Sequence, residues 1–137
     1  DLHMSQPFIY DIGECGDHVE VDYRPMIQEL VLNLTTPTFD LSELSRRFHT
    51  TIVDIISTVC KHLSVLSGIH QIVLSGGVFC NEFILLNAID KLQTEGLKPY
   101  FHQHVPTNDG GISLGQIVVA DASIRLQHQI EKEIQHV

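Results

Sequence analysis

Apolar side chains recur every three or four residues along the segment 41–66, which is the spacing of one face of an α-helix. The positions are Leu41, Leu44, Phe48, Ile52, Ile55, Val59, Leu63 and Leu66. Asp40, with Glu43 three residues later, is typical of a helix start, and Gly68 is typical of a helix end. The pattern predicts a long amphipathic helix between Asp40 and Gly68.

The segment before this helix contains shorter elements. Residues 7–22 alternate loosely and break at Gly13 and Gly16, which predicts a β-hairpin. A helix is expected from Pro25 to about Leu34, because proline is well tolerated in the first turn of a helix.

The segment after the long helix alternates between strands and helices. We expect a buried parallel strand at 71–75, a helix at 81–95, a strand at 99–102, and a last helix running from Gly111 through Ile117, Ile124 and Ile130 to the C-terminus. The order helix–strand–helix–strand–helix predicts an α/β fold with helices on the faces of the sheet.

Two adjacent glycines follow the first of these strands. Gly76 and Gly77 leave the backbone bare at the carboxyl end of the strand, where ligands of open α/β sheets lie. Asn81, four residues later, is placed to cap the next helix or to hydrogen-bond a sugar or base. A tight turn that needs positive φ explains the pair equally well.

The second strand is followed by a similar turn, Asn108-Asp109-Gly110-Gly111. Asp109 is either a helix N-cap or a carboxylate ligand of a metal, and spacing alone favours the cap. Because the carboxyl ends of neighbouring parallel strands share one edge of a sheet, both turns are expected to face one crevice. That coincidence favours a binding site.

Other polar residues give weaker signals. His102 and His104 fit a metal site poorly, because no third histidine is close in sequence. Arg46 and Arg47 are either solvated or face an adenine or phosphate group, and the sequence does not decide between the two. Cys80 has no base placed beside it, so a nucleophilic role is not favoured.

Composition narrows the class of protein. The chain has 137 residues, of which 43% are hydrophobic, and a net charge of −9. We therefore expect one folded domain, without bulk nucleic-acid binding and without a membrane span. Three widely spaced cysteines favour a reducing, cytoplasmic location. Residues 1–4 look like a cloning remnant, which leaves 5–137 as a single lobe.

Three stretches together resemble a known family. LSGGVFCNEFIL, HQHVPTNDGGISLGQ and RRFHTTIVDII are similar to the C-terminal end of the HypF-type carbamoyltransferases of nickel–iron hydrogenase maturation. The resemblance covers roughly residues 20 to 123. A more distant likeness links the chain to the universal tRNA threonylcarbamoyltransferases, which share both kinds of turn.

The resemblance implies the C-terminal lobe of an actin-like or RNase H-like (ASKHA) fold, with a mixed sheet flanked by helices. Gly76, Gly77 and Asn81 would lie against the adenosine of ATP or of carbamoyl adenylate. Asn108 and Gly110 in the second turn would complete the nucleotide site. Asp109 takes the place of the family's metal ligand, and that divalent metal would act as Lewis acid and template.

The implied reaction uses carbamoyl phosphate and ATP to carbamoylate the C-terminal cysteine of HypE, from which cyanide ligands are made. The family's HxxxH metal motif and phosphate-binding turn belong to a preceding lobe that this chain lacks, so we expect the fragment alone to be inactive. Alternatives are a lobe of a tRNA threonylcarbamoyltransferase, a lobe of a small-molecule O-carbamoyltransferase, or a non-catalytic nucleotide-binding or interaction module. Self-association is expected if the apolar helix face stays uncovered.

Overall fold

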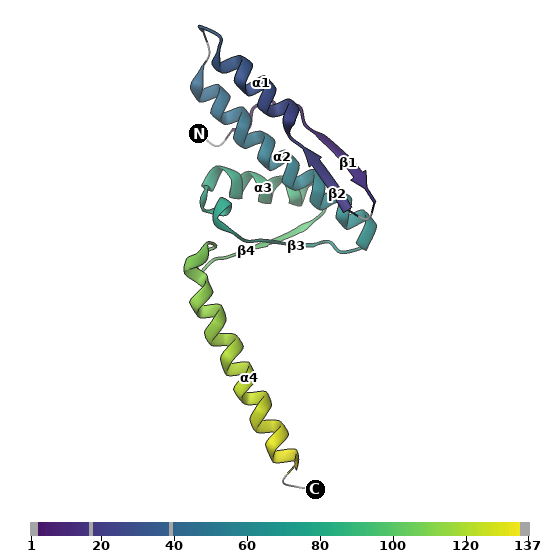
Figure 1. The fold of residues 1–137 in the computed structure, drawn as a ribbon, viewed down its shortest axis with the longest axis vertical. Helices are drawn as coiled ribbons and strands as arrows, with labels where there is room; N and C mark the ends of the chain where they lie inside the picture. The colour runs from purple at the N-terminus through teal and green to yellow at the C-terminus, as the bar shows by residue number, and fades with distance from the viewer. Residues whose placement is uncertain (1–2, 17, 39, 135–137) are drawn as a thin grey trace.

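A computed structural model describes residues 3–16, 18–38 and 40–134 (Figure 1). Its elements are β1 (Asp11–Cys15), β2 (His18–Asp22), α1 (Arg24–Leu34), α2 (Leu41–Ser67), β3 (Gln71–Leu74), η1 (Gly77–Cys80), α3 (Glu82–Thr94), β4 (Lys98–Phe101), η2 (Asp109–Gly111) and α4 (Ile112–Ile134), where η marks a short 3₁₀ turn. The order confirms the α/β class. The described strands form two separate two-stranded sheets instead of one mixed sheet.

The predicted hairpin and the helix after it are both present. β1 and β2 pair antiparallel, and Gly16 in the connecting turn has a φ of 66°, a left-handed conformation that glycine adopts without strain. α1 begins one residue before the predicted start, with Pro25 in its first turn. There the missing N–H of proline costs no helical hydrogen bond.

The long helix α2 begins and ends where the sequence places its limits. The Asp40 carboxylate accepts hydrogen bonds from the backbone N–H groups of Ser42, at 2.8 Å, and Glu43, at 3.3 Å. At the other end Gly68 adopts the left-handed conformation, with φ of 71°. Both features satisfy backbone groups that a helix end leaves without an intrahelical partner.

The buried face of α2 differs from the predicted one. Leu41, Leu63 and Leu66 are exposed, whereas the buried positions are Leu44, Thr50, Thr51, Val53, Ser57 and Ser64. Val53 is 0% exposed and packs in the main core cluster, together with Leu74, Ile84, Ala88, Leu92 and Leu97. Small serine side chains on one helix and Ala88 on the other suit the close packing of α2 on α3. A pattern of large apolar residues does not reveal this contact.

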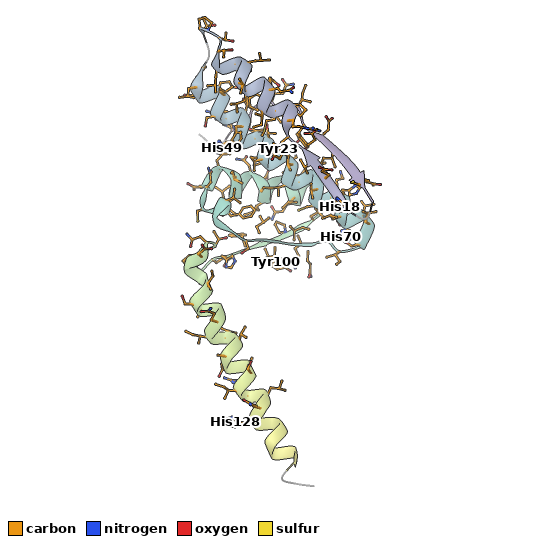
Figure 2. The ribbon with its side chains drawn as sticks, in the orientation of Figure 1. His18, Tyr23, His49, His70, Tyr100 and His128 are labelled. Carbon is orange, nitrogen blue, oxygen red and sulfur yellow. The ribbon has the colours of Figure 1, made fainter. Side chains whose placement is uncertain are left out.

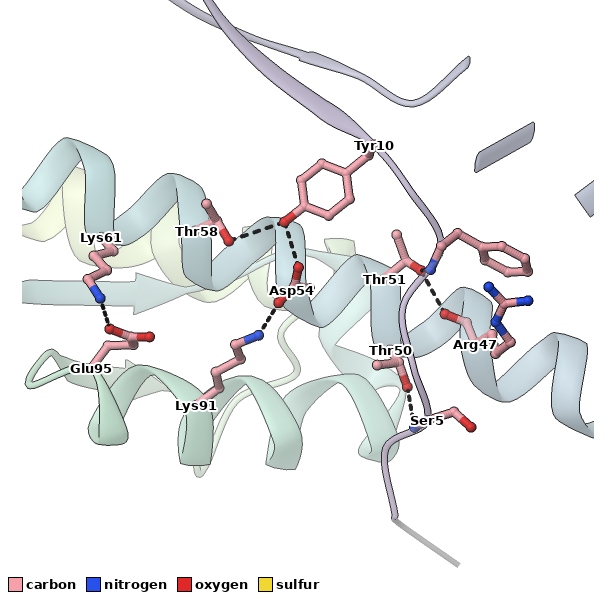
Figure 3. Close-up of polar contacts among 11 residues, drawn as sticks. Ser5, Tyr10, Arg47, Thr50, Thr51, Asp54, Thr58, Lys61, Lys91 and Glu95 are labelled. Atoms are coloured by element: carbon pink, nitrogen blue, oxygen red, sulfur yellow. Dashed lines mark hydrogen bonds and ion pairs between the residues drawn. The ribbon is translucent and has the colours of Figure 1, made fainter. Parts of the chain in front are cut away.

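The segment before β1 lies along α2 and is held by threonine hydroxyls (Figure 3). The backbone N–H of Ser5 donates to Thr50 at 3.1 Å, and that of Phe8 donates to Thr51 at 2.8 Å. The Arg47 guanidinium lies 4.0 Å from the centre of the Phe8 ring. Phe8 forms a second core cluster with Met26 and Leu44. These contacts attach the N-terminal segment and α1 to α2.

The strands β3 and β4 are parallel, as predicted, and only one face of this sheet is covered. Leu74 pairs with Phe101 and packs in the core cluster with residues of α2 and α3. Val73 pairs with Tyr100, which lies on the opposite side of the sheet (Figure 2). Val73 is 72% exposed, so the expectation of a buried strand is wrong for half of its residues. In this chain nothing among the described residues packs on that second face.

The last helix, α4, projects from the body on the uncovered side of the sheet (Figure 1). Its exposed apolar side chains are Ile112, Leu114, Ile117, Val118, Val119, Ile124 and Leu126. Within the described part of the chain, every helix is too short or too polar to cross a membrane. Residues 135–137, where the last helix was expected to continue, lie outside the described residues, as do residues 1 and 2 of the predicted cloning remnant.

Candidate functional site

The two glycine turns meet at the carboxyl ends of β3 and β4, and we refer to residues 75–81 and 107–111 as the turn pair. The backbone N–H of Gly76 donates to the carbonyl of Thr107 at 2.9 Å. In return the Thr107 hydroxyl donates to the Gly76 carbonyl at 3.2 Å. The structure therefore brings together the two turns that the sequence placed at one crevice.

The glycines of the turn pair differ in what the fold requires of them. Gly76 has a φ of 108°, which a residue with a side chain adopts only under strain. A Cβ on Gly111 would lie 2.8 Å from the Pro106 carbonyl oxygen, and one on Gly110 would lie 3.1 Å from the Asn108 side chain. Gly77 has an ordinary φ, and a Cβ there would meet only the Asn108 Cβ, at 4.0 Å. The chain itself gives no reason for a glycine at position 77.

The two asparagines are held by the turns they stabilise. The Asn81 side-chain oxygen accepts from the backbone N–H of Ile84 at 3.3 Å and so caps α3. The Asn108 oxygen accepts from the N–H of Gly110 at 3.0 Å, while its amide nitrogen donates to the Cys80 sulfur at 3.7 Å. The Asn108 side chain thus adds a side-chain link between the two turns to the backbone link between Gly76 and Thr107.

The favoured reading of Asp109 as an N-cap is wrong. The capping residue of η2 is Asn108, and Asp109 occupies the first turn of that 3₁₀ helix. The Asp109 side chain is exposed and makes no hydrogen bond or ion pair with the described residues. Its carboxylate is therefore available for a ligand. The sequence could not separate the two adjacent residues, because asparagine and aspartate cap helices about equally well.

The histidines near the site do not form a metal cluster. The His102 Nε2 atom lies 3.1 Å from the Ser75 hydroxyl, which links the ends of β3 and β4. Within the described residues, no group of three or more histidine, cysteine, aspartate or glutamate side chains is placed to hold a metal ion.

A groove of about 230 Å³ adjoins the turn pair at Asn81. Its lining comes from the starts of α2 and α3 and consists of Ser42, Ser45, Arg46, His49, Asn81 and Phe83. Of the two arginines that the sequence left undecided, Arg46 lines this groove. Arg47 is structural, because its guanidinium pairs with Glu29 at 2.8 Å and covers Phe8. Sequence reasoning missed Ser42, Ser45, His49 and Phe83, although His49 lies within the RRFHTTIVDII stretch.

Comparison with known proteins assigns the family. The family described as "Carbamoyltransferase, Kae1-like Domain, second subdomain" matches residues 3–116. The chain belongs to the HypF-type carbamoyltransferases. The family assignment confirms the resemblance that the two glycine turns carry and agrees with an actin-like, RNase H-like lobe.

The relatives are much longer than this chain. The carbamoyltransferase HypF of Synechocystis sp. is 31% identical over 98 residues, which is 72% of this chain and 12% of the relative. A probable carbamoyltransferase HypF of Methanocaldococcus jannaschii is 30% identical over 107 residues, covering 71% of this chain and 14% of the relative. The chain thus spans about an eighth of these proteins.

A solved structure of the family has the same fold. The crystal structure of full-length HypF in the phosphate- and nucleotide-bound form superposes with a TM-score of 0.78 at 32% sequence identity. The superposition covers 88% of this chain and 16% of that protein. Since α4 has 23 residues, a superposition of this extent includes part of that helix.

Proposed function

We propose that this chain is the C-terminal lobe of a carbamoyltransferase that uses carbamoyl phosphate and ATP, by way of carbamoyl adenylate, to carbamoylate the C-terminal cysteine of HypE. The observation that carries the proposal is the turn pair, in which Gly76 and Thr107 are joined by two hydrogen bonds. It presents bare backbone beside the Asn81 and Asn108 side chains, as a nucleotide wall requires. The product would serve the synthesis of cyanide ligands in hydrogenase maturation.

The glycines and asparagines would hold the nucleotide. Gly77 has no conformational or packing reason to be glycine, and close approach of a ligand to the backbone supplies one. Gly76 and Gly110 shape the same surface, and Asn81 and Asn108 bring side-chain amides to its rim. The net charge of −9 opposes bulk binding of nucleic acid but leaves room for one nucleotide in a local pocket.

Asp109 would hold the divalent metal together with ligands from another part of the enzyme. A hard divalent cation takes several oxygen ligands, and one carboxylate is too few. The residues present therefore fit half of a metal site. When bound, the metal would polarise carbamoyl or phosphate oxygens as a Lewis acid. The task of this chain is to point the Asp109 carboxylate across the crevice.

The first subdomain of the same enzyme is the expected partner of the uncovered surfaces. α4 is apolar almost all round from Ile112 to Ala122, which is typical of a helix buried on several sides. The face of the sheet that carries Val73 and Tyr100 is also uncovered. The family is that of a second subdomain, so a first subdomain provides the natural cover. Without it, we expect the lobe to self-associate and to lack activity. The compartment we expect is the cytoplasm.

The test is carbamoyl transfer to HypE from carbamoyl phosphate and ATP by the enzyme that carries this lobe. Asp109→Ala should lower the rate about a hundredfold or more, because it removes a ligand of the metal that stabilises charge in the transition state. Asp90→Ala is the matched control, since the Asp90 side chain is exposed on α3 and makes no hydrogen bond or ion pair with the described residues. Equal rates for Asp109→Ala and Asp90→Ala would contradict the metal role.

The isolated 137-residue chain is tested in the same carbamoyl-transfer assay and for ATP binding. It should transfer no carbamoyl group, and ATP added to it in a calorimeter should give a metal-dependent signal that Asp109→Ala removes. Carbamoyl transfer by the isolated chain would show that a single lobe closes the site, and the two-lobe proposal would then fail.

A further inference from the structure

A small hollow adjoins the turn pair at the carboxyl ends of β3 and β4, and we call it the His102 hollow. Its volume is about 60 Å³, and its lining consists of Leu74, Phe79, Leu85, Phe101, His102 and Thr107. Phe79 and Thr107 belong to the two turns of the pair, so the hollow borders the surface proposed for the nucleotide. Sites for drug-sized ligands have roughly 300–1,000 Å³, and this hollow therefore admits only a small group.

The lining of the hollow is apolar apart from one imidazole and one hydroxyl. The Thr107 hydroxyl already donates to the Gly76 carbonyl, so His102 brings the polar group of the lining that is able to exchange a proton. A cysteine side chain is a small hydrophobic group with a weak S–H donor, which suits such a lining. A charged ligand would lose its hydration there without an opposite charge to replace it. The hollow therefore fits a thiol better than an ion.

The His102 ring is held at one of its two nitrogens. Its Nε2 atom lies 3.1 Å from the hydroxyl of Ser75, which follows the neighbouring strand. When Nε2 carries the hydrogen and donates it to Ser75, Nδ1 keeps a lone pair that accepts a proton. Nδ1 makes no hydrogen bond with the described residues. An imidazole held at one nitrogen and open at the other is the arrangement of a general base.

The other titratable groups around the hollow are engaged or have another task. Lys98 and Tyr100 on β4 interact with each other, and β3 has no titratable side chain. In the turn pair, the Cys80 sulfur accepts a hydrogen bond from the second turn, and Asp109 is the proposed metal ligand. His104 lies outside the lining of the hollow. Among the described residues, the imidazole in the hollow is thus the base that is best placed for a reaction beside the turn pair.

From this geometry we infer that His102 is the general base for the acceptor thiol of the carbamoyl transfer, with Ser75 as the residue that positions its ring. The acceptor cysteine side chain enters the His102 hollow. The inference rests on the proposed function, which supplies both carbamoyl adenylate and an acceptor cysteine. A base is needed because a cysteine thiol ordinarily has a pKa of about 8.5, so that only a few per cent of it is thiolate at pH 7.

The step is a proton transfer followed by a substitution at the carbamoyl carbon. The Nδ1 atom of His102 takes the proton of the thiol, and the sulfur attacks the carbamoyl carbon of carbamoyl adenylate. The C–S bond forms while the C–O bond to the phosphate of AMP breaks, and AMP leaves with that electron pair. The imidazolium then gives its proton to water, which restores the base for the next cycle.

Carbamoyl transfer to HypE by the enzyme that carries this lobe tests the inference with three variants. His102→Gln keeps a side chain that can hydrogen-bond Ser75 but cannot take a proton, and it should lower the rate at pH 7 about a hundredfold or more. Ser75→Ala leaves the base in place without its anchor and should lower the rate about tenfold. His104→Gln is the matched control, because His104 lies outside the hollow, and it should leave the rate unchanged.

The pH dependence separates a base from a merely structural residue. Between pH 7 and pH 9 the acceptor thiol ionises without help, so the rate deficit of His102→Gln relative to the unaltered enzyme should shrink about tenfold or more. A deficit that is the same at both pH values, or an unaltered rate in His102→Gln, would overturn the inference and leave the proposed function in place. If His102→Gln does not fold, the Ser75→Ala deficit decides by the same criterion. If the unaltered enzyme transfers no carbamoyl group to HypE, the proposed function fails and the inference fails with it.

Discussion

The helices α2 and α4 are stabilised in very different ways. α2 forms the body of the molecule together with α3, whereas α4 projects from that body. α2 is covered on one side by α3 and on another by the N-terminal segment, and its contacts include buried serines and threonines. α4 has apolar residues on most sides and nothing packed against them among the described residues. One helix is stabilised by its own chain, whereas the other presents a surface suited to an additional partner.

Polar contacts strengthen the same contrast. Asp54 on α2 pairs with Lys91 on α3 and accepts a hydrogen bond from Tyr10 (Figure 3). On α4 the ion pair given by the structure is Arg125 with Asp121, four residues apart on the same exposed helix. A pair of that kind supports a helix by only about 0.3–0.5 kcal/mol and connects it to nothing else. Polar side-chain contacts between elements therefore stabilise the body, whereas the ion pair on α4 connects α4 to no other element.

Truncation of one leucine in each region should separate them most clearly. Leu92 is 0% exposed, so Leu92→Ala should lower the free energy of unfolding of the isolated chain by about 2–5 kcal/mol. Leu126 on α4 is 59% exposed, and Leu126→Ala should change that free energy by no more than about 0.5 kcal/mol. Urea unfolding followed by circular dichroism measures both.

The leucine comparison is run at two protein concentrations, because self-association makes the unfolding midpoint depend on concentration. A cost for Leu126→Ala as large as that for Leu92→Ala, with no dependence on concentration, would mean that α4 packs on its own chain. The contrast between the two regions would then be lost.

The sequence predicted the element order because helix starts and ends have local chemical signals. Asp40 and Gly68 were identified from spacing alone, and both cap α2 as expected. The buried face of α2 was not predictable in this way, because the burial of polar residues such as Ser57 and Ser64 depends on tertiary packing. The same limit applied at the site. The meeting of the two turns followed from the topology of parallel strands, but the groove at Asn81 forms between the starts of α2 and α3, which are distant in the sequence.

Substitution of the two adjacent glycines should separate an effect on the stability of the body from an effect on ATP binding. Gly76→Ala should lower the free energy of unfolding by about 1–2 kcal/mol, because its φ of 108° is strained for a residue with a side chain. Gly77→Ala meets only one atom, at 4.0 Å, and should leave stability almost unchanged. Both variants should lose ATP binding, since each places a methyl group on the nucleotide wall. Full ATP binding by Gly77→Ala would mean that no nucleotide approaches the backbone closely at this position.

The smallest effect we expect comes from the phenol of Tyr10, which ties the N-terminal segment to α2. Burial raises the pKa of this phenol from 10.0 to about 12, and the Asp54 carboxylate that accepts its hydrogen bond acts in the same direction. A group whose pKa is higher in the folded state favours folding below its unfolded pKa and loses that contribution as the pH rises. Stability should therefore fall between about pH 10 and pH 12, where the phenol ionises in the unfolded chain but stays protonated in the folded one. Tyr10→Phe should remove this part of the fall in stability and lower the free energy of unfolding by about 0.5–1.5 kcal/mol at neutral pH.

Unfolding midpoints of both proteins are measured across this pH range, with tyrosinate absorbance as a second signal that distinguishes Tyr10 from the other ionising groups. Identical pH profiles for the two proteins would mean that the phenol does not hold the N-terminal segment to the body.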